Sequence, residues 1–89
     1  MDELLEQIFM LAIKVNRETE KAVWAEYIGH VDGFDLRIAE GKKEPAYYDC
    51  EFHEMCYFDG VLANEAMSKL KIMKEVLCGL LKEGKEVEA

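Results

Sequence analysis

The chain has 89 residues, of which 51% are hydrophobic and 34% are charged, and its formal net charge is −8. This composition is typical of one folded domain and excludes a disordered chain. The acidic balance, with a pI near 4.7, disfavours direct nucleic-acid binding because phosphates are repelled, and no run approaches the ~18 apolar residues of a membrane-spanning helix.

The N-terminus and the cysteine content predict a cytoplasmic protein. The first ten residues, MDELLEQIFM, are acidic and amphipathic, whereas a secretory signal begins with basic residues and continues with an apolar run. The odd number of cysteines (Cys50, Cys56 and Cys78) is typical of free thiols in a reducing compartment.

The first predicted element is an amphipathic helix over residues 2–20. Asp2 suits the N-cap position. Leu5, Ile8, Ala12 and Val15 recur at helical spacing, while most charged side chains fall on the other side. We therefore expect one stripe of this helix to pack on the core.

The next predicted element is a β-hairpin over residues 22–41. Asp32 and Gly33 form a pair that is preferred in two-residue type I′ turns. A two-residue turn would pair three sets of residues on one face: Val31 with Phe34, Gly29 with Leu36, and Tyr27 with Ile38.

A third strand is predicted over 46–53, with Tyr48, Cys50 and Phe52 on one face. Residues 54–58 either extend this strand or form a loop. A last helix is predicted over 60–83, with Asp59 as its N-cap and Gly84 at its end.

These elements predict a single α+β domain over 1–84, followed by a frayed tail over 85–89. The predicted order is α-β-β-β-α: a three-stranded antiparallel meander with both helices packed on one face. Two layers are sufficient because each helix has one apolar stripe and the sheet has one strongly apolar face.

The stretch CEFHEMC suggests an alternative, a small zinc-binding domain through Cys50, His53 and Cys56. Structural zinc needs four converging ligands. On a strand, positions 50 and 56 share one face while position 53 points to the other. We therefore expect no metal and no cofactor, with the cysteines acting as small apolar residues.

No catalytic residues are predicted. Cys56 with His30 or His53 would supply a thiol and an imidazole, but nothing in the sequence orients such a pair. Pairs of carboxylates such as Asp49 and Glu51 are expected by chance among 19 acidic residues. The chain is accordingly expected not to be an enzyme.

The predicted contact surface is the sheet face opposite the helices. It would carry Trp24, Ile28, His30, Arg37 and Tyr47. Trp, Tyr and Arg are the residue types that anchor protein interfaces. We expect this face, or a strand edge, to bind another protein or a second copy of the chain, most simply as a homodimer.

Three short segments support a resemblance: Val15–Thr19 at the end of the first helix, Tyr27–Val31 and Leu36–Ile38. Over residues 4–38 the chain resembles small uncharacterised proteins of phages and prophages in Gram-positive bacteria. The resemblance implies a bacterial cytoplasmic setting and a phage-encoded accessory role, and it brings no catalytic residues.

The predicted function is therefore that of a non-enzymatic phage- or prophage-type accessory protein that acts through protein–protein contacts, as a homo-oligomer or on a host or phage protein. The alternative is an acidic inhibitor of a host nucleic-acid-binding protein, of the anti-restriction or anti-CRISPR type. That role would require carboxylates gathered on one face.

Overall fold

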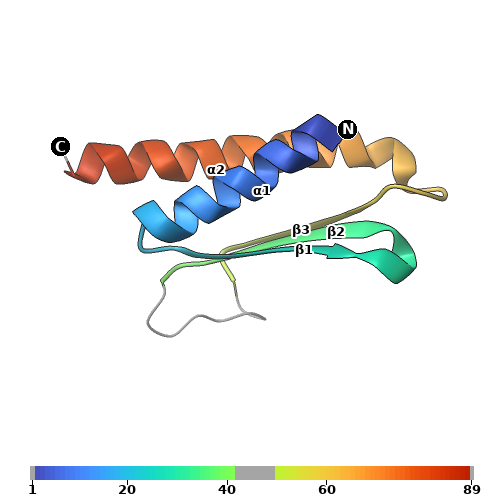
Figure 1. Ribbon diagram of the computed structural model, residues 1–89, viewed down its shortest axis with the longest axis horizontal. Helices are drawn as coiled ribbons and strands as arrows, with labels where there is room; N and C mark the ends of the chain where they lie inside the picture. Colours follow the sequence, from blue (N-terminus) through green and yellow to red (C-terminus); the bar gives the residue numbers. More distant parts are fainter. Residues whose placement is uncertain (1, 42–49, 89) are drawn as a thin grey trace.

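The computed structural model describes the backbone of residues 2–41 and 50–88, and the side chains of these residues up to 83. Its elements, in chain order, are α1 (Asp2–Glu18), β1 (Ala22–Ile28), η1 (Gly29–Val31), β2 (Gly33–Ala39), β3 (Phe52–Tyr57), η2 (Ala63–Glu65) and α2 (Ala66–Glu88). The strands form one antiparallel sheet in the order β1-β2-β3. Both helices lie on the same side of it (Figure 1), so the predicted α+β meander is confirmed.

Helix α1 forms as predicted and ends two residues earlier, at Glu18. Its buried residues are Ile8, Ala12 and Val15, which recur at the spacing of one helical stripe. Thr19 closes the helix because its hydroxyl donates to the Val15 carbonyl at 2.7 Å. The apolar stripe therefore determines which side of α1 faces the sheet.

Asn16 joins the end of α1 to the first strand. Its side-chain nitrogen donates to the carbonyl oxygen of Val23 at 3.0 Å, and its side-chain oxygen accepts from the Val23 amide at 2.9 Å. The side chain of Asn16 makes the two hydrogen bonds that a neighbouring strand would otherwise make with Val23. Two backbone groups on the sheet edge are therefore satisfied. The contact fixes α1 over the sheet.

The prediction of a two-residue hairpin turn is wrong. Strand β1 ends at Ile28, and Gly29–Val31 form a 3₁₀ turn closed by Asp32, which adopts the left-handed conformation at φ 48°. Phe34 pairs with Tyr27 instead of Val31, a slip of four residues. An even slip leaves the residues that remain in the two strands on their predicted faces, so the apolar face of the hairpin survives the error.

Gly33 has a different role from the predicted one. It is the first residue of β2 and lies opposite Tyr57 of β3. A Cβ atom there would lie 3.2 Å from the carbonyl oxygen of Cys56. The close approach of β3, rather than the turn, therefore favours glycine at this position.

The third strand begins later than predicted. Strand β3 covers Phe52–Tyr57. It therefore includes most of residues 54–58, for which the sequence allowed either a strand or a loop. Residues 46–49 of the predicted strand lie outside the described residues. The shift places Cys56 opposite Phe34 and Phe52 opposite Ile38, on the side of the sheet that faces the helices.

Helix α2 is displaced toward the C-terminus relative to its prediction. Asp59 accepts from the amide of Gly60 at 2.8 Å and does not cap a helix, because Gly60 turns the chain at φ 83°. The helix begins at Ala66 and continues past Gly84 to Glu88, so residues 85–88 extend it instead of forming a frayed tail. One glycine costs a helix about 1 kcal/mol and does not necessarily end it.

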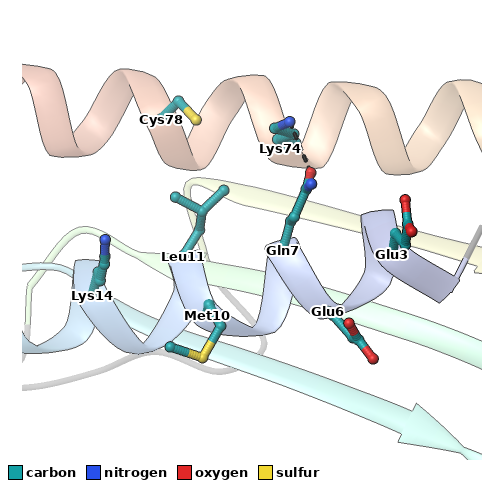
Figure 2. Close-up of a pocket in the computed structure, with 8 residues that line it drawn as sticks. All are labelled: Glu3, Glu6, Gln7, Met10, Leu11, Lys14, Lys74 and Cys78. Atoms are coloured by element: carbon teal, nitrogen blue, oxygen red, sulfur yellow. Dashed lines mark hydrogen bonds between the residues drawn. The ribbon is translucent and has the colours of Figure 1, made fainter.

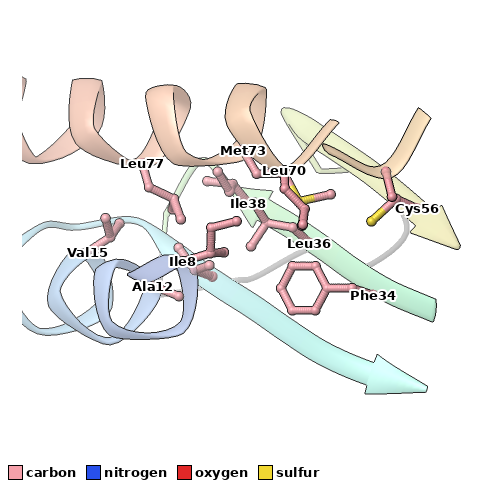
Figure 3. Packing of buried hydrophobic residues seen from close by; sticks show 12 residues of the cluster. Ile8, Ala12, Val15, Phe34, Leu36, Ile38, Cys56, Leu70, Met73 and Leu77 are labelled. Atoms are coloured by element: carbon pink, nitrogen blue, oxygen red, sulfur yellow. The ribbon is translucent and has the colours of Figure 1, made fainter. Parts of the chain in front are cut away.

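The core lies between the helices and the sheet (Figure 3). Its largest fully buried side chains come from both helices, from alternate positions of β2 and from one position of β3: Phe34, Ile8, Leu36, Ile38, Leu70, Met73, Leu77, Val15 and Cys56. Phe9 packs edge-on against Phe34, with ring centroids 5.2 Å apart. Among the described residues, no helix is long and apolar enough to cross a membrane.

Candidate functional site

The face of the sheet turned away from both helices is the candidate contact surface (Figure 1). Strand pairing arranges its side chains in rows across the three strands. We call these residues the open face: Trp24, Arg37 and His53 in one row, Glu26, Asp35 and Met55 in the next, and Ile28, Gly33 and Tyr57 in the third.

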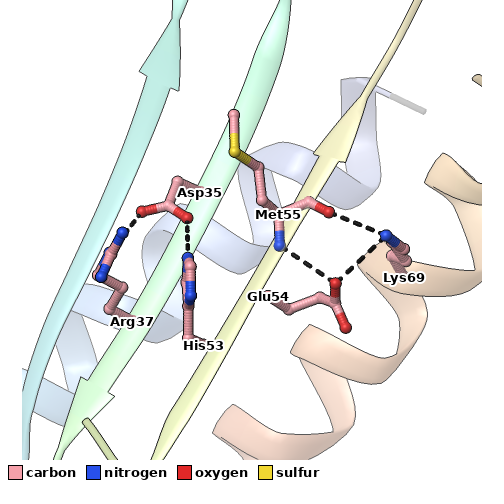
Figure 4. A network of polar contacts seen from close by, with 6 residues as sticks. All are labelled: Asp35, Arg37, His53, Glu54, Met55 and Lys69. Atoms are coloured by element: carbon pink, nitrogen blue, oxygen red, sulfur yellow. Dashed lines mark hydrogen bonds and ion pairs between the residues drawn. The ribbon is translucent and has the colours of Figure 1, made fainter. Parts of the chain in front are cut away.

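A carboxylate at the centre of the open face holds two basic side chains (Figure 4). Asp35 accepts from the Nε of Arg37 at 3.0 Å through one oxygen, and its other oxygen lies 2.6 Å from the Nε2 of His53. Asp35 is 3% exposed, whereas the His53 side chain is 42% exposed. The buried acid therefore fixes the orientation of a histidine that solvent or a partner can reach.

This cluster has part of the geometry of a general base, since an aspartate that orients an imidazole recurs in hydrolases. A nucleophile would have to approach the free edge of the imidazole. Cys56, the thiol considered for that role, lies opposite Phe34 on the helix side of the sheet. The cluster therefore supplies a rigid polar centre to the open face rather than the catalytic pair considered from sequence.

The structure brings together three of the five predicted contact residues. Trp24 pairs with Arg37, and Ile28 lies on the same face at the end of β1. His30 is exposed in the 3₁₀ turn and does not extend a strand. Tyr47 lies outside the described residues.

Sequence reasoning missed Met55 as a member of this surface, and it missed the contact between Asp35 and His53. Asp35 and Arg37 do alternate with Phe34, Leu36 and Ile38 along one strand, which was a signal for their shared face. The contact between Asp35 and His53 depends on the β2–β3 register, and the misplaced third strand concealed it.

The residues of CEFHEMC do not converge on one point. Cys56 is 1% exposed beneath the helices, and His53 lies on the open face. Within residues 2–41 and 50–83, no group of three or more His, Cys, Asp or Glu side chains is arranged to hold a metal ion. Cys56 and His53 therefore cannot bind the same zinc ion in this arrangement, as the zinc-binding alternative would require.

Cys56 also has the chemistry of a core residue. Burial raises the pKa of its thiol above the usual value, and the nearby ammonium of Lys69 opposes that effect only in part. A thiol with a raised pKa carries less reactive thiolate at neutral pH.

We expect iodoacetamide at neutral pH to alkylate exposed Cys78 at least about 100-fold faster than Cys56, because Cys56 becomes accessible only when the core opens. Peptide mass mapping over time measures both rates. Alkylation of Cys56 in the native protein at the rate of Cys78 would place it outside the core.

Lys69 fastens β3 to α2 beside the open face. Its ammonium donates to the carbonyl of Met55 at 3.1 Å and lies 3.3 Å from the carboxylate of Glu54. The hydrogen bond with Glu54 raises the pKa of Lys69. The link keeps one edge of the sheet in place without using any side chain of the open face.

The helical layer carries a second feature, a groove of about 500 Å³ between α1 and α2 (Figure 2). Met10, Leu11 and Cys78 form its apolar part. Lys74 spans it and donates to the side-chain oxygen of Gln7 at 2.8 Å. The groove lies on the opposite side of the molecule from the open face.

Comparison of the chain with family models, with curated proteins and with solved structures finds no match in any of the three. The function therefore has to be inferred from the chemistry of the surfaces described above.

Proposed function

We propose that the protein is a non-enzymatic accessory protein, of the kind encoded by phages and prophages, that works in the cytoplasm by binding another protein through the open face. This proposal rests on one observation. Both helices cover one side of the sheet (Figure 1), and the other side carries residue types that are common in protein interfaces. The phage-type setting rests on the resemblance over residues 4–38.

The composition of the open face favours a protein partner. Trp24, Tyr57, Met55 and Arg37 belong to the residue types that are enriched in interfaces. All four are half-buried, so neighbouring side chains already restrict their rotamers. Binding then loses less side-chain entropy than it would with fully exposed groups.

The ionic cluster adds specificity to this surface. Asp35, Arg37 and His53 are held by short contacts in fixed positions. A polar centre surrounded by apolar side chains rejects partners that cannot match its hydrogen bonds, because an unmatched polar group is costly to bury. The open face therefore suits one defined partner better than indiscriminate adhesion.

The acidic-inhibitor alternative has no comparable support. It needs carboxylates gathered on one side, but Glu3 and Glu6 lie on α1, Asp59 lies in a turn, and Asp35 is buried against Arg37 and His53.

Trp24→Ala is expected to weaken partner binding about 30-fold or more, the effect of losing an aromatic hot spot, with the free energy of unfolding lowered by no more than about 1 kcal/mol. Partner proteins are captured from the bacterial host with wild-type and variant chains side by side. The captured partner is then purified, and its affinity for each chain is measured by isothermal titration calorimetry, because Trp24→Ala removes the only tryptophan and with it the fluorescence signal.

Met67→Ala is the matched control, because Met67 is a 39% exposed apolar residue on α2. It should leave partner binding unchanged. Undiminished binding by Trp24→Ala would contradict the proposal, and a stability loss of several kcal/mol would show that Trp24 belongs to the core instead.

A further inference from the structure

Helix α1 carries a second stripe on the side that faces away from the core. Glu3, Glu6, Met10, Ile13 and Arg17 recur at alternating spacings of three and four residues, Lys14 follows Met10 by four, and all six are exposed. This spacing places them on one side of a helix. Met10 is 57% exposed and Ile13 is 42% exposed, so two large apolar side chains lie next to each other on the outer side of the helix.

The charges of this stripe change sign along the helix. The N-terminal half carries Glu3 and Glu6, and the C-terminal half carries Lys14 and Arg17, with Met10 between them. Figure 2 shows Glu3 and Glu6 toward one end of α1 and Lys14 toward the other. Within the described part of the chain, neither Glu6 nor Lys14 forms an ion pair.

The charge pattern of α1 is complementary to that of a second, antiparallel copy of α1. If two copies of α1 lie antiparallel with Met10 facing Met10, the pairs are Glu6 with Lys14, Glu3 with Arg17, and Gln7 with Ile13, each occurring twice. Opposite charges then meet at four places around an apolar centre. A two-fold symmetric interface requires this kind of self-complementarity.

We propose that the outer stripe of α1 (Glu3, Glu6, Met10, Ile13, Lys14 and Arg17) is the contact between two copies of the chain, packed as an antiparallel helix pair. The groove between α1 and α2 adjoins this stripe, and Met10 and Leu11 supply apolar surface along it (Figure 2).

A second copy fits this stripe better than an unrelated helix does. An unrelated partner would need acidic and basic groups at matching positions by chance, whereas the chain carries them already. The inference goes beyond the proposed function because it uses the opposite side of the molecule. A dimer built in this way leaves two open faces free, so it would bind a multivalent partner more tightly than a single chain.

The test exchanges charges across the proposed interface. Glu6→Lys and Lys14→Glu should each weaken self-association about tenfold or more, because each turns two attractive pairs into repulsive ones. Mixing the two variants restores both attractive pairs, so the mixture should form a heterodimer with near wild-type affinity. Sedimentation equilibrium at low salt measures all three, and circular dichroism checks that each variant is folded.

Glu26→Lys makes the same charge change on the open face and should leave the dimer intact, as should Trp24→Ala. The proposal is overturned if the wild-type chain stays monomeric at every concentration, if both charge reversals leave the dimer unchanged, or if the mixed variants stay apart. Loss of the dimer in Trp24→Ala but not in Glu6→Lys would likewise overturn it, and would place the self-contact on the open face.

Discussion

Replacing Phe34 with alanine is expected to lower the free energy of unfolding by about 3–5 kcal/mol. Phe34 is fully buried in the central strand, pairs with both Tyr27 and Cys56, and receives the edge of Phe9 at 5.2 Å. The whole domain is expected to be stable by about 4–13 kcal/mol at this length. The variant should therefore lose a large part of that stability, measured by urea unfolding at 25 °C.

The control for this variant is Val61→Ala, because Val61 is 93% exposed. It should change the free energy of unfolding by less than about 0.5 kcal/mol. A Phe34→Ala variant as stable as this control would mean that the core does not form between α1, α2 and β2 as described.

Arg37→Leu is expected to cost about 2–4 kcal/mol, because it leaves the buried carboxylate of Asp35 without its guanidinium partner. The side chains of Asp35 and Arg37 are 5% and 17% exposed, so water cannot fully replace the lost ion pair. The partial exposure of Arg37 puts the expected cost toward the lower end of the range for buried pairs. Urea unfolding measures this change as well.

The double variant Asp35→Leu/Arg37→Leu tests this reason directly. Removing both charges should destabilise the protein less than removing Arg37 alone, since no unpaired carboxylate remains. A double variant that costs the sum of the two single changes would show that Asp35 and Arg37 contribute independently.

The sequence was sufficient to predict the layers of the fold. Ile8, Ala12 and Val15 gave α1 its buried stripe, and the alternation of Phe34, Leu36 and Ile38 gave β2 its apolar side. Each pattern records which side of an element is buried. Two helices with one stripe each and a sheet with one apolar face have few ways to pack, so the architecture followed.

The turns and the helix ends were harder to predict, because local conformations of similar free energy compete there. Asp32 followed by Gly33 favours a tight turn, but Gly33 is needed against β3 and Asp32 closes a 3₁₀ turn instead. Gly84 was expected to end α2, which continues to Glu88. In each place a tertiary or helical contact outweighs a local preference of about 1 kcal/mol.

The candidate site was predicted only in part for a related reason. Trp24, Ile28 and Arg37 could be assigned to one face from alternation alone. The link between Asp35 and His53 joins residues 18 positions apart and depends on the pairing of two strands. Periodicity within one strand contains no information about its register with the next.

The two proposed contacts lie on opposite sides of the molecule. In the two proposals, the outer stripe of α1 joins two copies of the chain, and the open face of each copy binds a partner protein. Sequence reasoning assigned both contacts to the sheet, because it had no means of seeing Met10 and Ile13 exposed on α1. If the dimer contact is on α1, Glu6→Lys should dissociate the dimer. If it is on the sheet, Trp24→Ala should do so.

In our proposal the protein works as an assembled contact protein rather than through a bound metal. Native mass spectrometry of the untagged chain, purified without chelator, distinguishes the two. We expect a dimer at twice the chain mass of 10.3 kDa, with no additional ion. A monomer that carries one zinc ion, lost on denaturation, would contradict it.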